Sequence, residues 1–323
     1  MKTGELWHES AVKSAIRTVD LPQGGENQVL IESEYSLISL GTERLVAKGL
    51  IPHSISEEMQ VPYMEGAFSF PCKYGYSLVG KVIHGPAGYL GRRVHVMHPH
   101  QDHAWVDTGS VYTLSEGIPP QRAVLASPLE TAINAIWDSE ISVGDSILVV
   151  GFGLVGALIC LVAAGIPGVQ VQVHETNENR RSMAAKLGFG LYQEKFPRVV
   201  FDKAFNTSAD EGGLQLCIDK TGNEGTIIEV SFYGVRQVSV MLGAGYHTGR
   251  KRIIASQVSR IPANRLVRWD YYRRKQLVFD LLKNDSFDSL MGESIPFTDS
   301  PDFFNTLRKG SIDAISVIIN YQQ

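Results

Sequence analysis

The pattern of hydrophobic and polar positions changes twice along the chain. In the first third, short apolar runs are interrupted by glycine and proline, which predicts a β-rich region. From Pro120 onward, helical and strand-like segments alternate, which predicts a parallel sheet covered by helices. After about residue 255 a basic and aromatic stretch leads to two more helices and an apolar terminal strand. The pattern therefore predicts a doubly wound α/β domain inserted into a β-rich one.

These changes also predict the domain boundaries. A chain of 323 residues exceeds the size at which a single core usually stops growing, so we expect two domains. Residues 1–122 and 256–323 are expected to form the β-rich domain, and 123–255 the α/β domain. The expected strands are 28–34, 80–84, 93–97, 147–150, 169–173, 203–206, 225–231, 238–242 and 315–321, and the expected helices are 123–137, 154–164, 179–187, 213–220, 275–283 and 301–308.

The most specific pattern lies at 146–175. An apolar strand ends in Gly151, and Gly153 and Gly156 complete the spacing GxGxxG. In a dinucleotide fold these glycines allow a tight turn, a close approach of backbone to pyrophosphate, and close packing of the next helix on the strand. Strand, glycines, helix and second strand together predict a dinucleotide-binding site.

The residues after these glycines predict which dinucleotide binds. Leu154 and Val155 open a helix whose first N–H groups are expected to face the phosphates. The next strand ends at Glu175, whose carboxylate can accept the ribose 2′-hydroxyl of NAD and repels the 2′-phosphate of NADP. Arg180 on the following helix softens that repulsion. We therefore expect NAD(H) in preference to NADP(H).

Composition and charge narrow the function classes. The net charge of −4 gives no electrostatic reason to expect a nucleic acid or an anionic membrane as partner. The uncharged stretch 147–173 is long enough to span a membrane, but five glycines and a proline interrupt it. The N-terminus shows no apolar signal segment, and the three cysteines form no CxxC motif, so a cytoplasmic location is expected.

Several motifs spread over nearly the whole chain resemble the medium-chain dehydrogenase/reductase superfamily. They are Gly41-Thr42-Glu43, Lys73-Tyr74-Gly75-Tyr76-Ser77-Leu78-Val79-Gly80, Gly91-Arg92-Arg93-Val94 and Gly144-Asp145. The resemblance implies a GroES-like catalytic domain, a Rossmann domain, and hydride transfer to or from a nicotinamide cofactor. It also implies that Thr131 touches the nicotinamide ring.

The chain departs from this family at the catalytic zinc. Leu40 stands where the family has its first zinc cysteine. Tyr76 and Ser77 replace a histidine and a glutamate, and Ser127 replaces the third ligand. The four-cysteine structural zinc lobe is missing as well. Zinc prefers thiolate, imidazole or carboxylate ligands, so we expect no catalytic zinc.

One branch of the superfamily resembles the chain more than the others, the bacteriochlorophyllide hydroxyethyl dehydrogenase-like group. Its namesake oxidises a hydroxyethyl side chain of a tetrapyrrole to an acetyl group, and many members act on other substrates. The segments that carry this resemblance are 39–45, 98–102, 130–138, 256–258 and 268–269.

Without zinc, side chains must polarise the substrate oxygen and move its proton. Thr42 matches the family's proton-relay hydroxyl, so it is the first catalytic candidate. Tyr76 can donate a hydrogen bond to a substrate oxygen, or it can be an aromatic that fills the emptied metal cavity. Glu43 matches the acid that orients the zinc histidine in the family, and here we expect it in a structural ion pair.

A string of histidines leaves three alternatives open. It contains His95, His98, His100 and His103, with Asp102 between the last two. His100 and Asp102 can form an acid–base pair near the substrate, the string can bind a metal, or it can be a polar loop. His247 is either near the nicotinamide or in a surface turn. The basic and aromatic stretch 265–275 is expected to pack at a domain junction rather than bind nucleic acid.

Three functions follow from these residues. The first is a zinc-independent, NAD(H)-dependent oxidoreductase acting on a secondary alcohol or ketone as a small-molecule substrate. The second is an NADPH-dependent reductase of activated carbon–carbon double bonds, and the third is a dinucleotide-binding protein without catalytic activity. We also expect a homodimer that pairs through the apolar strand at 238–242.

Overall fold

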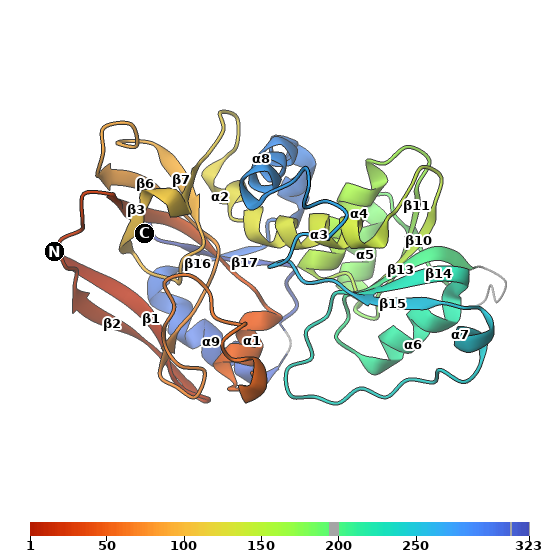
Figure 1. Cartoon of the computed structure of the whole chain (residues 1–323). Helices are drawn as coiled ribbons and strands as arrows, with labels where there is room; N and C mark the ends of the chain where they lie inside the picture. The colour runs from red at the N-terminus through yellow and green to blue at the C-terminus, as the bar shows by residue number, and fades with distance from the viewer. Residues whose placement is uncertain (194–199, 311, 323) are drawn as a thin grey trace. The chain divides into compact units, whose positions relative to one another are not determined.

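The computed structural model describes residues 1–193, 200–310 and 312–322, and the chain forms two compact units (Figure 1). The first unit comprises Met1–Ser127 and the chain from Lys275 onward, and the second comprises Pro128–Arg274. The division thus falls after Ser127 and Arg274 rather than after residues 122 and 255. Both boundaries lie inside helices, whereas boundaries predicted from turn residues fall between helices and strands.

The larger sheet of the first unit joins the N-terminal region to the end of the chain. Its strand order is β16–β17–β3–β6–β7–β9, and β8 pairs with β3 outside this path. Strand β17 pairs antiparallel with β3, so the return segment completes the sheet. The strands expected at 28–34, 80–84, 93–97 and 315–321 are confirmed. The bounds are β3 (Gln28–Ile38), β6 (Leu78–His84), β7 (Arg93–Val96), β8 (His103–Asp107), β9 (Val111–Thr113), β16 (Glu293–Pro296) and β17 (Val317–Asn320).

A second, smaller sheet was not predicted from the sequence. Its order is β2–β1–β5–β4, with bounds β1 (Lys2–Ser10), β2 (Lys13–Asp20), β4 (Glu65–Gly66) and β5 (Cys72–Lys73). Strand β1 is almost entirely buried although it carries polar residues. Its Glu5 accepts from Lys73 at 2.7 Å, and its His8 hydrogen-bonds with Ser14 at 2.8 Å. Because these buried polar side chains have hydrogen-bond partners, the strand is buried although its sequence lacks the alternation of apolar and polar residues that usually predicts a strand.

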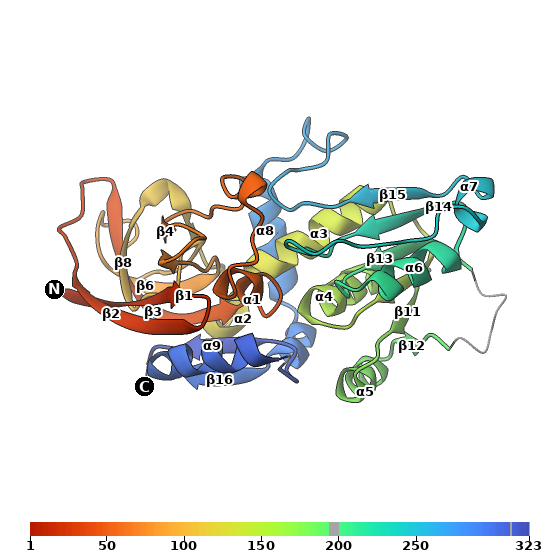
Figure 2. The same ribbon diagram turned by 90° about the horizontal axis from the view of Figure 1, so that it is seen from below.

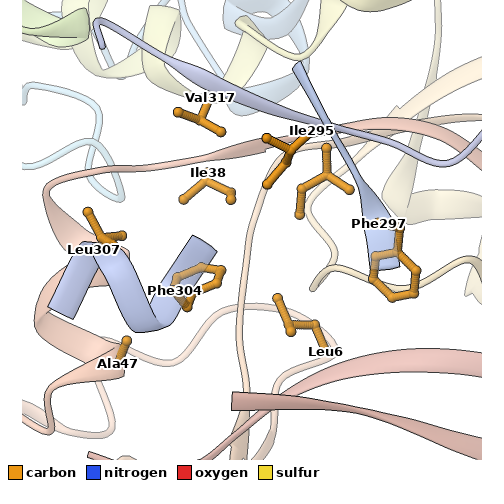
Figure 3. Close-up of a cluster of buried hydrophobic side chains, with 9 residues drawn as sticks. Leu6, Ile38, Ala47, Ile295, Phe297, Phe304, Leu307 and Val317 are labelled. Atoms are coloured by element: carbon orange, nitrogen blue, oxygen red, sulfur yellow. The ribbon is translucent and has the colours of Figure 1, made fainter. Parts of the chain in front are cut away.

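The core of the first unit collects residues from both ends of the chain. Helix α9 (Ser300–Lys309) lies against β2 and the short helix α1 (Thr42–Ala47), as Figure 2 also shows. Its side chains meet apolar residues of β1, β3 and β17 in one cluster (Figure 3). The cluster consists of Leu6, Ile38, Ala47, Ile295, Phe297, Phe304, Leu307, Val317 and Ile319.

The second unit is built on a parallel sheet with the order β12–β11–β10–β13–β14–β15. Numbered along the chain within this unit, the order is 3-2-1-4-5-6, which is the doubly wound dinucleotide-binding arrangement. The predicted α/β fold class is therefore confirmed. The strands are β10 (Ser146–Val150), β11 (Gln170–His174), β12 (Gly190–Leu191), β13 (Phe201–Asn206), β14 (Thr221–Glu229) and β15 (Arg252–Ala255).

The helices agree with the expected pattern except at their ends. Helix α4 (Leu154–Ala164) has the expected bounds. The helix expected at 123–137 is divided into α2 and α3. The other bounds are α2 (Pro120–Ala123), α3 (Ala126–Ser139), α5 (Glu178–Lys186), α6 (Glu211–Lys220), α7 (Gly245–Thr248) and α8 (Tyr271–Leu282).

The expectation of a strand at 238–242 is wrong. Val238 and Val240 pack with period two, but onto the apolar cluster beside α6 rather than into the sheet. The backbone N–H groups of Ser239 and Met241 donate to side chains of α6, at 3.3 and 2.7 Å. The last strand of the sheet is β15, so a dimer cannot pair through a strand at 238–242.

The basic and aromatic stretch 265–275 belongs to the second unit up to Arg274, while Lys275 belongs to the first. Trp269 meets Trp137 of α3 at a ring-centroid distance of 4.8 Å, and Arg273 lies 4.1 Å above Trp269. Residues 265–270 precede α8 and do not form one helix with it. In the described part of the chain, every helix is too short or too polar to cross a membrane.

Candidate active site and dinucleotide site

Two glycines of the GxGxxG turn in the second unit, Gly151 and Gly156, are required by close backbone contacts. Gly151 follows β10 with φ at +94°, and a Cβ there would lie 2.9 Å from the backbone N of Ser208. A Cβ on Gly156 would lie 2.1 Å from the carbonyl oxygen of Gly151 and 2.7 Å from the Oγ1 of Thr207. Only glycine fits either position without a shift of the backbone. Gly156 thus brings α4 close to the end of β10.

Gly153 is different, because space surrounds it. It is the N-cap of α4, and the nearest atom to an added Cβ is a guanidinium nitrogen of Arg180, at 3.9 Å. Leu154 and Val155 follow it and are partly exposed. Since α4 starts here without a side-chain cap among the described residues, its first N–H groups suit an anionic ligand such as a pyrophosphate.

Glu175 follows β11 and binds the glycine turn. Its Oε2 accepts from the N–H of Phe152 at 2.7 Å, and its Oε1 accepts from the N–H groups of Thr176 and Asn177 at 2.7 and 2.8 Å. The Thr176 hydroxyl also donates to Oε1, at 3.4 Å. Each carboxylate oxygen has about two acceptor sites, so Oε2, with one bond among the described contacts, leaves room for a ribose hydroxyl. Glu175 therefore positions the turn as well as offering a negative charge beside it.

These residues surround the point where the strand order reverses. The reversal lies between β10 and β13, and Gly151 and Thr207 follow these two strands. In such sheets ligands bind beyond the carboxyl ends of the strands at this point. The sequence interpretation missed a polar group at the same edge, in which Asn206 donates to Glu229 and to the Tyr233 hydroxyl, each at 2.8 Å. Each of these three side chains ends or follows a strand, a placement that the sequence alone would have allowed us to predict.

The two expected neighbours of the nicotinamide, Thr131 and His247, both belong to the second unit. Thr131 lies on α3 and is partly exposed. His247 lies on α7, which immediately precedes β15, and its side chain is exposed. It therefore lies at the amino-terminal edge of the parallel sheet, whereas Gly151 lies at the carboxyl-terminal edge. Of the two alternatives for His247, the structure favours the surface turn.

In the first unit, Thr42 and Tyr76 come together. Thr42 opens α1, and the side chains of Thr42 and Ser39 act on the hydroxyl of Tyr76, each lowering its pKa. Burial raises the pKa of Tyr76 to about 12, and the negative charge of Glu43 contributes to the same shift. The phenol is therefore protonated at neutral pH and can donate a hydrogen bond.

Glu43 lies against the side chain of His100. The two side chains are 0% exposed, and the Oε2 of Glu43 lies 2.8 Å from the Nε2 of His100. The other carboxylate oxygen accepts from the N–H of Ser39 at 2.8 Å. The pair joins α1 to the segment after β7, residues that are 57 positions apart in the sequence.

The histidine string does not act as one group. His100 and Asp102 do not bond to each other among the described contacts: Asp102 accepts from Thr3 at 2.6 Å and lies 3.1 Å from the Nδ1 of His103. His98 is buried against the ring of Tyr63. The segment 98–100 is not a strand, so strand alternation does not place His98 and His100 on one face. Within the described ranges, no group of three or more His, Cys, Asp or Glu side chains is placed to hold a metal ion.

The positions at which the family holds zinc are occupied by side chains with other contacts. Leu40 packs against the apolar cluster of the first unit. The hydroxyl of Ser77 donates to the carbonyl of Val124 at 2.6 Å, and that of Ser127 donates to the carbonyl of Tyr76 at 2.7 Å. An alkyl side chain and two hydroxyls engaged with backbone carbonyls do not fit zinc.

Comparison with known proteins was made by sequence and by structure. No protein-family model matches the chain. An L-threonine 3-dehydrogenase of Pyrococcus furiosus is 29% identical over 121 residues, 38% of this chain and 34% of that protein, so the chain spans about a third of this relative's length. The 2-desacetyl-2-hydroxyethyl bacteriochlorophyllide A dehydrogenase of Rhodobacter capsulatus is 25% identical over 259 residues, 73% of this chain and 75% of that protein.

Solved structures match over nearly the full length. An acetophenone reductase from Geotrichum candidum in complex with NAD has a TM-score of 0.77 at 15% identity, covering 99% of this chain and 97% of that one. A protein from Sinorhizobium meliloti 1021 bound to NADP has a TM-score of 0.79 at 13% identity, covering 99% and 100%. The chain has the fold of these proteins. Its first unit is the GroES-like one, and its second is the Rossmann one.

Proposed function

We propose that this protein is an oxidoreductase that transfers a hydride between a nicotinamide cofactor and a secondary alcohol or ketone. The observation that carries the proposal is the glycine turn at the strand-order reversal. Gly151 and Gly156 allow close backbone packing there, and Gly153 leaves space at the start of α4 for a pyrophosphate. The relatives named above are dehydrogenases, which supports the same reaction class. The cofactor is NAD(H). Glu175 follows the second strand of the dinucleotide unit, and its carboxylate there supports this choice because it would repel a 2′-phosphate.

The residues of the first unit supply the proton chemistry. When bound, the nicotinamide accepts or supplies the hydride. The protonated hydroxyl of Tyr76 donates a hydrogen bond to the substrate oxygen and stabilises the negative charge that develops on it. Thr42 bonds to that hydroxyl and orients it. His100 and Asp102, the other candidates, act at most indirectly, since His100 lies behind Glu43 and Asp102 bonds to Thr3.

The reaction is zinc-independent. The contacts of Leu40, Ser77 and Ser127 support this part of the proposal, because these three side chains, which stand at family zinc positions, pack on apolar residues or bond to backbone carbonyls. Hydrogen-bond donors then replace the metal as the group that polarises the substrate oxygen.

The test is turnover of a panel of secondary alcohols and ketones by metal-stripped enzyme with NAD(H) or NADP(H). Hydride transfer with NAD(H), unchanged by chelator, is the expected result. Reduction of enones with NADPH and no alcohol activity would favour the carbon–carbon double-bond reductase. Tight cofactor binding without any turnover would favour a non-catalytic binding protein. One tightly held zinc per chain that restores activity would contradict zinc independence.

The partner of this chain is a second copy of itself. Strand β15 ends the parallel sheet, and Ile253 on it is 36% exposed. Strands at a sheet edge offer backbone groups for pairing with another chain. Light scattering at micromolar concentration should give the dimer mass, and Ile253→Lys should give the monomer. A monomer in the wild type would reject the homodimer.

A further inference from the structure

A cavity of about 470 Å³ lies in the first unit, where the β1–β2 hairpin meets the carboxyl ends of α1 and α9. Three of its six described lining residues are basic, and none of the six is acidic. Lys48 directly follows α1, and Arg308 and Lys309 are the last two residues of α9. The six residues, called the Arg308 cavity below, are Ala11, Val12, Lys48, Asn305, Arg308 and Lys309.

Arg308 is a buried cation without a counter-ion. It is 9% exposed, and every partner that it has among the described residues is uncharged. Other buried cations of this unit have a carboxylate: the Nζ of Lys73 lies 2.7 Å from Glu5, and the Nη2 of Arg122 lies 2.6 Å from Asp288. Burial without such a partner disfavours the charged form, and it lowers the pKa of Arg308. An anion in the cavity would supply the missing charge.

The partners of Arg308 hold its guanidinium in place and leave one N–H over. Its Nε donates to the carbonyl of Ala47 at 2.9 Å, and its Nη1 donates to the Oδ1 of Asn305 at 3.0 Å. Its Nη2 donates to the Oγ of Ser14 at 2.7 Å and lies 3.4 Å from the Nδ1 of His8. His8 is neutral, because burial lowers its pKa to about 3. A guanidinium has about five N–H donors, so one N–H of Nη1 has no described partner and can serve a ligand.

The other polar groups of the cavity are also donors. Lys48 and Lys309 are exposed, and neither forms an ion pair within the described ranges. The oxygen of the Asn305 amide accepts from Arg308, which leaves its NH₂ group to donate. The cavity therefore offers two ammonium groups, an amide and a guanidinium N–H.

The helix ends offset only part of this positive charge. The carboxyl end of a helix carries about half a negative elementary charge. The ends of α1 and α9 together therefore offset about one of the three positive charges that line the cavity. The remaining charge suits a dianion better than a single carboxylate.

We propose that the Arg308 cavity binds a phosphate dianion, either free or as the phosphate group of a small molecule. Guanidinium and ammonium groups are both common phosphate ligands in proteins. The cavity volume falls in the range of small-molecule sites, about 300–1,000 Å³, so an organic group can accompany the phosphate. The site uses none of the residues assigned to the cofactor or to hydride transfer, so it goes beyond the proposed function.

The test is a titration of the full chain with inorganic phosphate, at a pH where phosphate is a dianion. Methyl NMR of Val12, which lines the cavity, reports binding there. Glycerol phosphate is titrated in parallel, and potassium chloride keeps the ionic strength equal. We expect a saturable shift with at least one of the two phosphates and none with chloride alone. The ligand that binds more tightly identifies the source of the phosphate group. Absence of a saturable shift with both would overturn the proposal.

Removal of the exposed charges tests where the phosphate binds. Lys48→Gln combined with Lys309→Gln should weaken binding about tenfold, because two attractive charges are lost. Lys81→Gln is the matched control, since Lys81 is an exposed lysine of β6 that is not among the described lining residues. It should leave the affinity unchanged. Unchanged affinity in the double variant, or an equal loss in Lys81→Gln, would overturn the proposal.

Removal of the buried charge gives the larger effect. Arg308→Gln should abolish the saturable shift of Val12, and a shift retained in the folded variant would contradict the proposal. Arg308 also holds the carbonyl of Ala47, so where this variant does not fold, the double lysine variant decides the outcome. Phosphate bound at the glycine turn of the second unit would not respond to these substitutions. The result therefore does not depend on whether the proposed function is correct.

Discussion

At the scale of single residues, Glu175 has two tasks that substitution can separate. Its carboxylate accepts from the N–H of Phe152 in the glycine turn, and in the proposed function it also presents a charge to the ribose of the cofactor. Glu175→Gln keeps an acceptor oxygen and removes the charge. We expect the affinity for NADH to fall about tenfold and that for NADPH to rise, measured by fluorescence titration. Glu178→Gln, with its side chain 83% exposed on α5, is the control that should change neither. Tighter binding of NADPH than NADH by the wild type would refute the cofactor assignment.

The hydroxyls of Thr42 and Tyr76 have the most direct chemical prediction. Thr42→Ala and Tyr76→Phe each remove a donor or its orienting partner, and loss of one such donor typically lowers turnover by about a hundredfold or more. We expect that loss in kcat with little change in cofactor affinity. Tyr35→Phe removes an exposed hydroxyl of the same unit and should leave kcat unchanged. Wild-type turnover in both active-site variants would mean that the proton takes another route.

Residues close in sequence were predictable, and those brought together by the fold were not. The GxGxxG spacing and Glu175 lie within one strand–helix–strand unit, so their local pattern identifies them. One of the three alternatives for the histidine string paired His100 with Asp102, two positions along the sequence. His100 pairs instead with Glu43, because the antiparallel pairing of β3 with β6 and β8 positions these segments. No short-range pattern encodes that contact.

At the scale of elements, the glycine turn gives a prediction with an internal control. Gly156→Ala places a methyl group 2.1 Å from the carbonyl oxygen of Gly151, so α4 must move away from β10. Overpacking of this kind typically costs about 1–3 kcal/mol, and we expect a lower Tm together with lost cofactor binding. Gly153→Ala meets no atom closer than 3.9 Å, so it should retain Tm and lose only cofactor affinity. Equal stability of the two variants would contradict the packing role of Gly156.

Helices and strands could be predicted wherever the spacing of apolar residues reflected burial of one face of a sheet or helix. The segment 238–242 shows the limit, since its valines alternate because they pack beside α6 while its N–H groups bond to side chains of that helix. The period-two pattern of a strand and that of an extended segment lying over a helix are the same. Strand β1 shows the opposite limit, because its buried face is polar and paired.

At the scale of the whole molecule, the two units differ in buried histidines. His8, His95 and His98 all belong to the first unit, and burial lowers their pKa values, to about 3 for His8 and for His98 and well below 6.5 for His95. In the unfolded chain each would titrate near 6.5. The second unit contains no buried histidine among its described residues. The first unit should therefore be the acid-sensitive one.

The sign of this effect follows from proton uptake. Below pH 6.5 the unfolded chain binds protons at these three histidines while the folded unit does not, so stability falls as pH falls from 6.5 toward about 3. Between pH 6.5 and about 4.5 carboxyl groups remain mostly ionised, so the histidines dominate the pH dependence of stability. Near pH 5 the free energy of unfolding should change with pH with a slope that approaches three protons, about 4 kcal/mol per pH unit. We expect hydrogen exchange in the full chain to show the first unit losing protection before the second. His98→Gln should reduce the slope by about one proton, and His247→Gln, at an exposed position, should not change it. A slope that is the same in His98→Gln and the wild type would show that this histidine is not held neutral by the fold.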